Sequence, residues 1–239
     1  MLISYHKTGA LLVINLQMIK VYPYSDFPPD ADTRLRRQLL SPIKQKDTGT
    51  ALFHNDAAFD WIYPEHFQLM SYKQFTPLAV ARKAAAFLAE PNARVLDIGS
   101  GVGKFCLTAA HYYPETFFHG IEQRHELVYF AEEAKRYTRL NNAWFTHGNL
   151  TRVNFKEFDH FYFYNSFYEN LDPDNRIDDT IETSFSLYTY YTQYLFSALN
   201  EKPSGTRLVT FHSTEDEIPP GYCLVDVSYD TLLKMWIKR

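Results

Sequence analysis

The sequence predicts an α/β fold in which a mostly parallel sheet is covered by helices on both faces. An apolar run at residues 95–98 leads into a glycine-rich turn, as a buried parallel strand does where it enters a helix. A second apolar run, residues 117–121, is followed by Glu122 at the spacing of a βαβ unit. The almost wholly aromatic run at residues 158–164 is typical of a strand buried on both faces.

The composition indicates one large domain with an appendage. The chain has 239 residues and a net charge of −4, so it lacks a global positive field that would attract nucleic acid or an anionic membrane. Cys106 and Cys223 have no metal-ligand spacing and fit a reducing compartment. The apolar run at residues 10–16 is far too short to cross a bilayer, and no cleavage site follows it. We therefore expect a cytoplasmic protein with no membrane partner.

The glycine-rich turn is the strongest functional signal. Gly99, Gly101 and Gly103 stand at alternate positions, where they permit positive φ and let a ligand approach the backbone closely. A helix that begins near Gly103 points its free N–H groups at the same place. A nucleotide-like ligand is therefore expected here.

The spacing of the glycines decides which nucleotide is favoured. A dinucleotide fingerprint needs a third glycine where this chain has Lys104, which weakens an interpretation as an NAD-dependent oxidoreductase. Glu122, 19 residues after Gly103, lies where a second strand would offer a carboxylate to ribose hydroxyls.

Residues 97–103 and Glu122 together resemble the class I S-adenosylmethionine-dependent methyltransferases. The resemblance implies a Rossmann-like seven-stranded sheet, mostly parallel and closed by a terminal antiparallel hairpin, with S-adenosyl-L-methionine as the cofactor. The cofactor contacts it implies in this region are Asp97, Gly99, Ser100, Gly101, Gly103, Glu122 and Gln123.

The segment before the core is harder to interpret. We expect residues 1–66 to form an N-terminal extension or substrate cap and residues 67–239 the methyltransferase core. Residues 56–70 mix aromatic and turn residues and fit a lid or pocket wall better than a regular element. Thr76 is expected to cap a helix over residues 77–88.

Phe75 precedes that helix and has two interpretations. Residues 74–77 are similar to a segment of amino-group methyltransferases whose aromatic residue lies against the methionine part of the cofactor. Alternatively, Phe75 only staples the start of the helix.

The chain continues with the expected alternation of helices and strands. Helices are predicted at residues 104–112 and after Glu122, and a third strand at residues 143–147. The family usually carries an aspartate after this strand, where it accepts the amino hydrogens of adenine. Asn149 stands there in this chain, and its amide oxygen can still accept.

The aromatic fourth strand delivers residues 165–168 to the carboxyl edge of the sheet. Enzymes that methylate amino or amide nitrogens carry Asp, Asn or Ser, two prolines and an aromatic residue here. This chain keeps Asn165 and Tyr168 but has Ser166 and Phe167 in place of the prolines. The loop at residues 97–104 also resembles that of the seven-stranded histone lysine methyltransferases. Those enzymes have an Asn-containing aromatic turn at the site of residues 165–168.

Asn165 and Tyr168 are the candidate catalytic residues, and Asn165 also a candidate cofactor contact. Methyl transfer from a sulfonium is an in-line displacement, so an amide oxygen that orients an amine would favour it. The aromatic face of Tyr168 would help to hold a cationic group. The alternative is that Asn165 only caps a turn and Tyr168 is a core residue.

The remaining elements complete the predicted fold. A long helix is expected over residues 178–199 and a fifth strand over residues 206–212. Strands at residues 222–227 and 232–238 would form the terminal hairpin. The histidines show no i,i+4 pair, so no metal site is expected.

The sequence therefore predicts an enzyme that transfers a methyl group from S-adenosyl-L-methionine to a nitrogen acceptor. The acceptor stays open among a protein side chain, a nucleic acid base and a small amine, and so does the oligomeric state. The first alternative is a module that binds S-adenosylmethionine without turnover, and an NAD-dependent oxidoreductase is less favoured.

Overall fold

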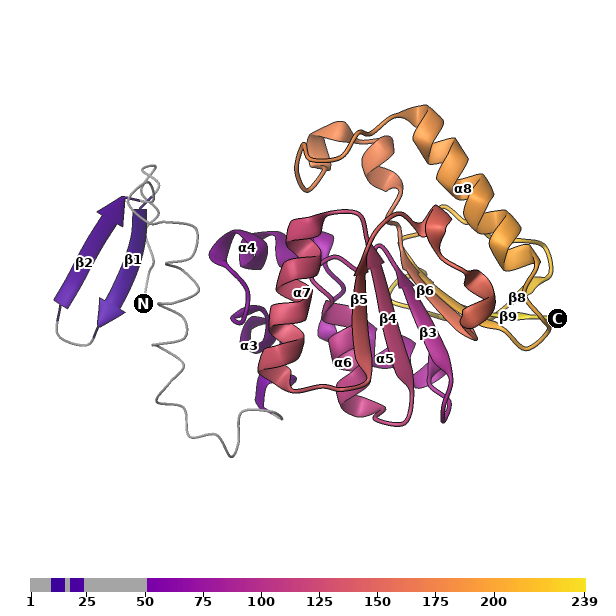
Figure 1. The fold of residues 1–239 in the computed structure, drawn as a ribbon, viewed down its shortest axis with the longest axis horizontal. Helices are drawn as coiled ribbons and strands as arrows, with labels where there is room; N and C mark the ends of the chain where they lie inside the picture. The colour runs from indigo at the N-terminus through magenta and orange to yellow at the C-terminus, as the bar shows by residue number, and fades with distance from the viewer. Residues whose placement is uncertain (1–9, 16–17, 24–50) are drawn as a thin grey trace. The chain divides into compact units, whose positions relative to one another are not determined.

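The computed structural model describes residues 10–15, 18–23 and 51–239 of the chain. The chain divides into two compact units, residues 1–48 and 49–239. In the first unit, strands β1 (Ala10–Asn15) and β2 (Met18–Pro23) pair antiparallel, with Asn15 opposite Met18. The second unit contains the predicted α/β sheet (Figure 1).

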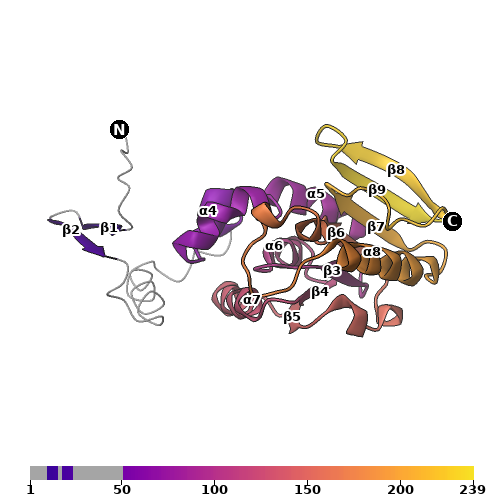
Figure 2. The same ribbon diagram turned by 90° about the horizontal axis from the view of Figure 1, so that it is seen from above.

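The second unit is built on a seven-stranded sheet, which confirms the predicted fold class. Its strands are, in spatial order, β5 (Ala143–His147), β4 (Phe117–Glu122), β3 (Arg94–Ile98), β6 (His160–Tyr164), β7 (Arg207–Phe211), β9 (Leu233–Lys238) and β8 (Tyr222–Ser228). The first five are parallel, and β9 and β8 are antiparallel to their neighbours. Figure 2 shows this hairpin at one end of the sheet and β5 at the other.

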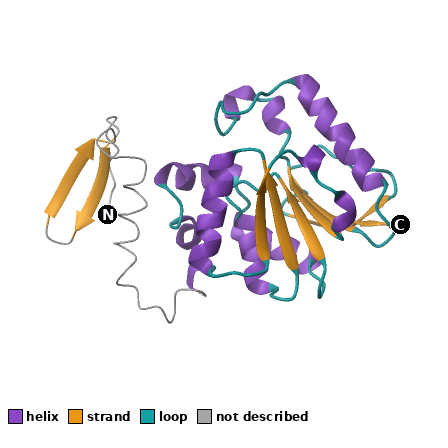
Figure 3. Ribbon diagram, viewed as in Figure 1, coloured by secondary structure: helices purple, strands orange, loops and turns teal. Residues whose placement is uncertain are grey.

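Helices cover both faces of the sheet (Figure 3). One face packs against α5 (Leu78–Leu88), α6 (Lys104–Tyr112) and α7 (His125–Thr138), and the other against α8 (Phe185–Asn200). Alternate strand residues enter the two cores: Val95 lies in the first core, and Leu96 and Ile98 lie in the second. The central strands are therefore buried on both faces, as their apolar sequences predict.

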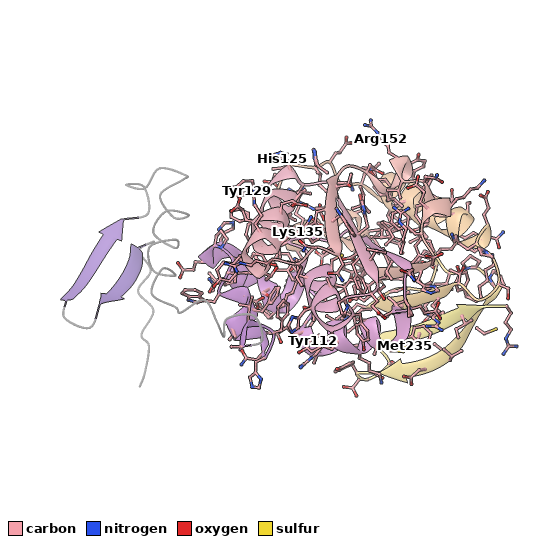
Figure 4. The ribbon with its side chains drawn as sticks, turned by 60° about the horizontal axis from the view of Figure 1, so that its bottom comes forward. Tyr112, His125, Tyr129, Lys135, Arg152 and Met235 are labelled. Carbon is pink, nitrogen blue, oxygen red and sulfur yellow. The ribbon has the colours of Figure 1, made fainter. Side chains whose placement is uncertain are left out.

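Helix α7 shows how the surface helices are oriented. Leu127, Ala131 and Ala134 form its buried face. His125 and Tyr129 are exposed, and Figure 4 shows them on the same helix as Lys135. The helix therefore buries one stripe and leaves its other side to solvent.

The segment before α5 is more regular than the sequence predicts. Residues 56–70 were expected to be an irregular lid, but α3 (Asp56–Asp60) and α4 (Glu65–Gln74) are helices. The buried residues of α4 are Phe67 and Ser71, so no continuous apolar stripe marks the helix in the sequence.

This segment also differs from the expected domain division at residue 66. Phe53, Phe59 and Tyr63 are buried in the same core as α5 and α6. Apolar burial thus joins residues 51–66 to the sheet unit rather than to the preceding unit.

Two predicted helix starts are wrong. Thr76 does not cap α5, because Pro77 is the N-cap and the Thr76 hydroxyl bonds with that of Tyr162 at 2.9 Å. Helix α8 begins at Phe185 instead of residue 178, and Ser184 caps it by accepting from the Leu187 N–H. Among the described residues, no helix is long and apolar enough to cross a bilayer.

Candidate functional site

A cavity of about 540 Å³ lies at the carboxyl ends of the parallel strands. Its lining includes six of the predicted site residues: Gly99, Gly101, Glu122, Gln123, Asn165 and Tyr168. A smaller cavity of about 30 Å³ is lined by the same two glycines together with Phe75, Asp97 and Ser100. Gly103 and Asn149 are in the lining of neither cavity.

The glycine turn makes close contacts that a side chain would prevent. Gly99 has φ +76°, and a Cβ there would lie 2.3 Å from Ser166 Oγ. Gly101 has φ +54°, and a Cβ there would lie 3.2 Å from the ring of Phe75. The turn therefore touches both the residue after Asn165 and the candidate cofactor contact Phe75.

Glu122 ends β4 with its carboxylate buried beside the turn. Oε2 accepts from the Gly101 N–H at 3.1 Å, and Oε1 accepts from the Arg124 N–H at 2.8 Å. Burial raises the pKa of Glu122, although these two N–H donors and the Arg124 charge oppose the rise. Its position between two backbone donors fixes the carboxylate at the edge of the cavity.

Asp97 is the second buried acid of the site. Its carboxylate accepts from Cys106 Sγ at 3.5 Å. Burial raises the Asp97 pKa to about 8, the Cys106 hydrogen bond opposes the rise and the charge of Glu122 adds to it. The group therefore holds its proton near neutral pH in the absence of a further partner.

Asn149 is engaged within the protein. Its Oδ1 accepts from the Thr151 N–H at 3.0 Å. Its Nδ2 donates to Gln123 Oε1 at 2.9 Å and to the Tyr191 hydroxyl at 2.8 Å. The oxygen expected to accept from adenine thus caps a 3₁₀ turn, η2 (Leu150–Arg152), while the nitrogen orients Gln123.

Asn165 occupies a left-handed position directly after β6. Its φ is +39°, a region that asparagine tolerates better than most residues. The Asn165 carbonyl accepts from the Tyr168 N–H at 3.0 Å. The side-chain amide of Asn165 has no hydrogen bond to any residue that the structure describes, so it is available to a ligand in the cavity.

The two residues that replace the family's prolines fasten this turn. Ser166 Oγ donates to the Ile98 carbonyl at 2.5 Å and so ties the turn to the end of β3. Phe167 is buried against Phe163 and Tyr191. Hydrogen bonding and packing thus do here what two rigid prolines would do.

Tyr168 begins the short turn η4 (Tyr168–Asn170) and is 44% exposed. The alternative that Tyr168 is a core residue is therefore wrong. Tyr168 is also one of the residues that line the cavity.

Sequence reasoning missed two buried cations that hold the walls of the site. The Arg124 guanidinium contacts Glu169 and Asp178. The Lys104 ammonium lies 2.7 Å from a carboxylate oxygen of Asp56 and of Asp60. Each cation stands at the N-terminal end of a helix, where the helix dipole disfavours positive charge. That unfavourable placement was the available signal that carboxylate partners had to be near.

Comparison with known proteins identifies a family for this chain. A family model described as a methyltransferase domain matches residues 89–220. No curated protein sequence matches the chain.

Several solved structures are similar in fold. TrmN from Thermus thermophilus is 19% identical, with a TM-score of 0.49 over 68% of this chain and 48% of that chain. An RNA methyltransferase from Salinibacter ruber, in complex with S-adenosyl-L-homocysteine, is 20% identical, with a TM-score of 0.45 over 68% of this chain and 91% of that chain. Precorrin-6y C5,15-methyltransferase from Geobacter metallireducens is 12% identical, with a TM-score of 0.45 over 69% and 88%. This chain thus spans about half the length of the Thermus structure.

The chain belongs to the methyltransferase domain family, whose model matches more than half of it. The residues present fit S-adenosylmethionine, the cofactor that the sequence predicts, because the glycine turn leaves backbone open at a cavity of about 540 Å³, within the ~300–1,000 Å³ usual for cofactor sites. The family match favours a methyltransferase over the less favoured NAD-dependent oxidoreductase.

Proposed function

We propose that this enzyme transfers the methyl group of S-adenosylmethionine to a nitrogen acceptor that Asn165 orients. The proposal rests mainly on Asn165, which follows β6, lines the cavity and has a side-chain amide without a hydrogen bond to a described residue. When bound, the cofactor supplies an electrophilic methyl group on a sulfonium. The Asn165 oxygen accepts from the acceptor N–H, which aims the nitrogen lone pair at that methyl group.

The cofactor is proposed to extend along the carboxyl edge of the sheet. Glu122 accepts from the ribose hydroxyls, and Gln123 contacts the base in an orientation fixed by Asn149. Gly99 and Gly101, which line both cavities, would let the cofactor approach the backbone closely. Phe75 borders the methionine part, beside Asp97 in the smaller cavity.

The charges of the cavity favour a cationic acceptor. Carboxylates in its lining are Glu122, Glu169, Asp172 and Glu182. Two cations also line the cavity: Arg124, which pairs with Glu169 and with Asp178, and Lys73, which bonds with the neutral side chain of Asn175. Carboxylates therefore outnumber cations in the lining by four to two. A protonated amine is attracted to this lining, whereas a nucleic acid phosphate is repelled. A protein side chain or small amine therefore fits better than a nucleic acid.

A labelling screen tests the acceptor atom. The enzyme is incubated with methyl-labelled S-adenosylmethionine and panels of amines, peptides and RNA, and the labelled atom is located by mass spectrometry. Label on nitrogen, with a rate that rises with pH toward the acceptor pKa, is the expected result. Label found on oxygen, sulfur or carbon would refute the assignment.

Asn165→Ala tests the proposed role of the amide. We expect kcat to fall on the order of 10²-fold, as when one preorganised hydrogen-bonding group is removed, with little change in cofactor affinity. Asn141→Ala, an exposed asparagine, is the matched control. Undiminished turnover in Asn165→Ala would remove Asn165 from the mechanism.

A further inference from the structure

Arg124 makes an unusually complete set of contacts for a buried side chain. It is 3% exposed, and its Nη1 and Nη2 donate to the two Glu169 oxygens at 3.0 and 2.6 Å. Nε donates to Asp178 Oδ1 at 2.9 Å. Burial lowers the Arg124 pKa, but the bonds and charges of Glu169 and Asp178 outweigh this effect and the pKa is raised. The pairing offsets the cost of burying the charge.

Both partners of Arg124 lie in one stretch of chain, residues 169–184, which we name the acidic segment. It carries six acids and one base: Glu169, Asp172, Asp174, Asp178, Asp179 and Glu182 against Arg176. The carboxylates of such a segment repel one another, so a compact conformation of the segment needs a cation among them. Arg124 lies where that cation is needed.

Further hydrogen bonds wrap the acidic segment around this cation. Glu169 Oε2 also accepts from the Ile177 N–H at 3.2 Å, and Asp178 Oδ1 accepts from the Thr180 N–H at 2.9 Å. The Ser184 N–H donates to Asn170 Oδ1 at 3.2 Å. The segment is therefore held at its start, its middle and its end.

The acidic segment forms one wall of the main cavity. Its residues in the lining are Glu169, Asn170, Asp172, Asn175, Ile177, Ile181, Glu182 and Thr183. It begins one residue after Tyr168, on the side of the candidate catalytic turn. Its position thus sets the space that an acceptor can occupy next to Asn165.

Arg124 also contacts the proposed ribose carboxylate. Its backbone N–H donates to Glu122 Oε1 at 2.8 Å. One residue therefore joins the cofactor side of the cavity, through its backbone, to the acceptor side, through its guanidinium.

We infer that Arg124 is a positioning residue that holds the acidic segment closed over the acceptor side of the cavity and couples this closure to cofactor binding. The coupling rests on the proposed role of Glu122. Closure can be observed without knowing the acceptor. The inference about closure can therefore fail while the nitrogen assignment stands, and the nitrogen assignment can fail while the inference about closure stands.

Trypsin supplies the direct test, because the Arg176–Ile177 bond lies inside the acidic segment. Cleavage of such a bond tracks the open population when opening is fast. Arg124→Met should increase the appearance of the fragment that begins at Ile177, followed by mass spectrometry, by about tenfold or more. Arg136→Met is the matched control, since Arg136 is an exposed arginine of the same helix paired only with Glu133 among the described residues, and it should leave the rate unchanged.

Ligand binding tests the coupling. S-Adenosylhomocysteine should slow cleavage at Arg176 in the unmodified protein but not in Arg124→Met. Arg124→Lys keeps the charge without the forked donors and should give an intermediate rate. With an acceptor in hand, Arg124→Met should raise KM for the acceptor more than it changes KM for the cofactor.

A double variant covers the outcome in which Arg124→Met fails to fold. Replacing Arg124 and Glu169 together by Leu removes both buried charges and should preserve cooperative unfolding. Its cleavage at Arg176 should still be fast and insensitive to S-adenosylhomocysteine. The inference would be overturned if the folded double variant were cleaved at Arg176 no faster than Arg136→Met. It would also be overturned if S-adenosylhomocysteine fully protected the double variant from this cleavage.

Discussion

Asp97 lies near the end of β3 with its side chain almost wholly buried, so its protonation is linked to folding. Its pKa is raised to about 8 in the folded state, whereas an unfolded aspartate ionises near pH 4. The folded state therefore binds more protons between these values. Its contribution to stability is complete below about pH 4 and is lost as the pH rises toward 8.

Asp97→Asn should flatten this dependence. Between pH 5 and 7, the unfolding free energy of the unmodified protein should fall relative to that of Asp97→Asn by on the order of 1 kcal/mol for each pH unit. Urea unfolding at several pH values measures it. Asp230→Asn is the control, because Asp230 is exposed in a turn with φ +51° that asparagine also adopts. Parallel stability curves for Asp97→Asn and unmodified protein would show that Asp97 is ionised in the fold.

Glu122 should matter for cofactor binding. Glu122→Ala is expected to weaken S-adenosylmethionine binding by on the order of 1–3 kcal/mol, because ribose hydroxyls lose a partner. Isothermal titration calorimetry measures the loss, with exposed Glu126→Ala as the control. Unchanged affinity would remove Glu122 from the site. Glu122→Gln should be milder, since it keeps one acceptor for the N–H groups of Gly101 and Arg124.

At the scale of elements, Lys104 joins the glycine turn to the helices before it. Its ammonium contacts Asp56 and Asp60 and donates to Ser71 Oγ at 2.9 Å. Asp56 also accepts from the Leu78 N–H at 2.9 Å, which links α3 to the start of α5. These contacts hold α3 and α4 beside the smaller cavity.

Lys104→Met should destabilise the fold by removing the cation between two carboxylates. The expected loss is about 2–3 kcal/mol, less than the ~3–5 kcal/mol for a fully buried pair, because Asp56 is 48% exposed. Denaturant unfolding measures the loss, with exposed Lys156→Met as the comparison. Equal stability in these two variants would show that Lys104 does not anchor the helices.

Local signals predicted most elements of the sheet unit. Helix α6 and strand β5 have the predicted ends, because Gly103 and the paired asparagines at 141 and 142 mark them in the sequence. The start of α8 was missed because Ile181 continues its apolar spacing, whereas Asp178 is held in a loop by Arg124. Local periodicity carries no information about such a long-range partner.

The same distinction applies to the candidate site. Glycine spacing and the predicted strand ends were enough to place Gly99, Gly101, Glu122 and Asn165 at the carboxyl edge of the sheet, and all four line one cavity. The side-chain amide contacts of Asn149 with Gln123 and Tyr191, and the ion pairs of the two buried cations, depend on residues 26 to 54 positions away. Those contacts follow from tertiary packing and could not be derived from spacing.

At the scale of the whole molecule, the division of the chain into two units determines which residues can be deleted without unfolding the sheet unit. The sheet unit begins at residue 49, and its core includes Phe53 and Phe59 at 1% and 0% exposure. Residues 1–48 form the other unit. We propose that the part of the expected cap before residue 49 affects acceptor access rather than the stability of the sheet unit.

Two truncations separate these roles. Deletion of residues 1–48 should leave a protein that unfolds cooperatively and binds S-adenosylmethionine, with an altered KM for the acceptor. Deletion of residues 1–60 should abolish cooperative unfolding, because it removes Phe53 and Phe59 from the core and leaves Lys104 buried without Asp56 and Asp60. Calorimetric melting and cofactor titration measure both variants. If the shorter deletion melts without a cooperative transition, the first 48 residues belong to the folding unit; if the longer deletion folds normally, α3 is dispensable and the anchoring role of Lys104 fails with it.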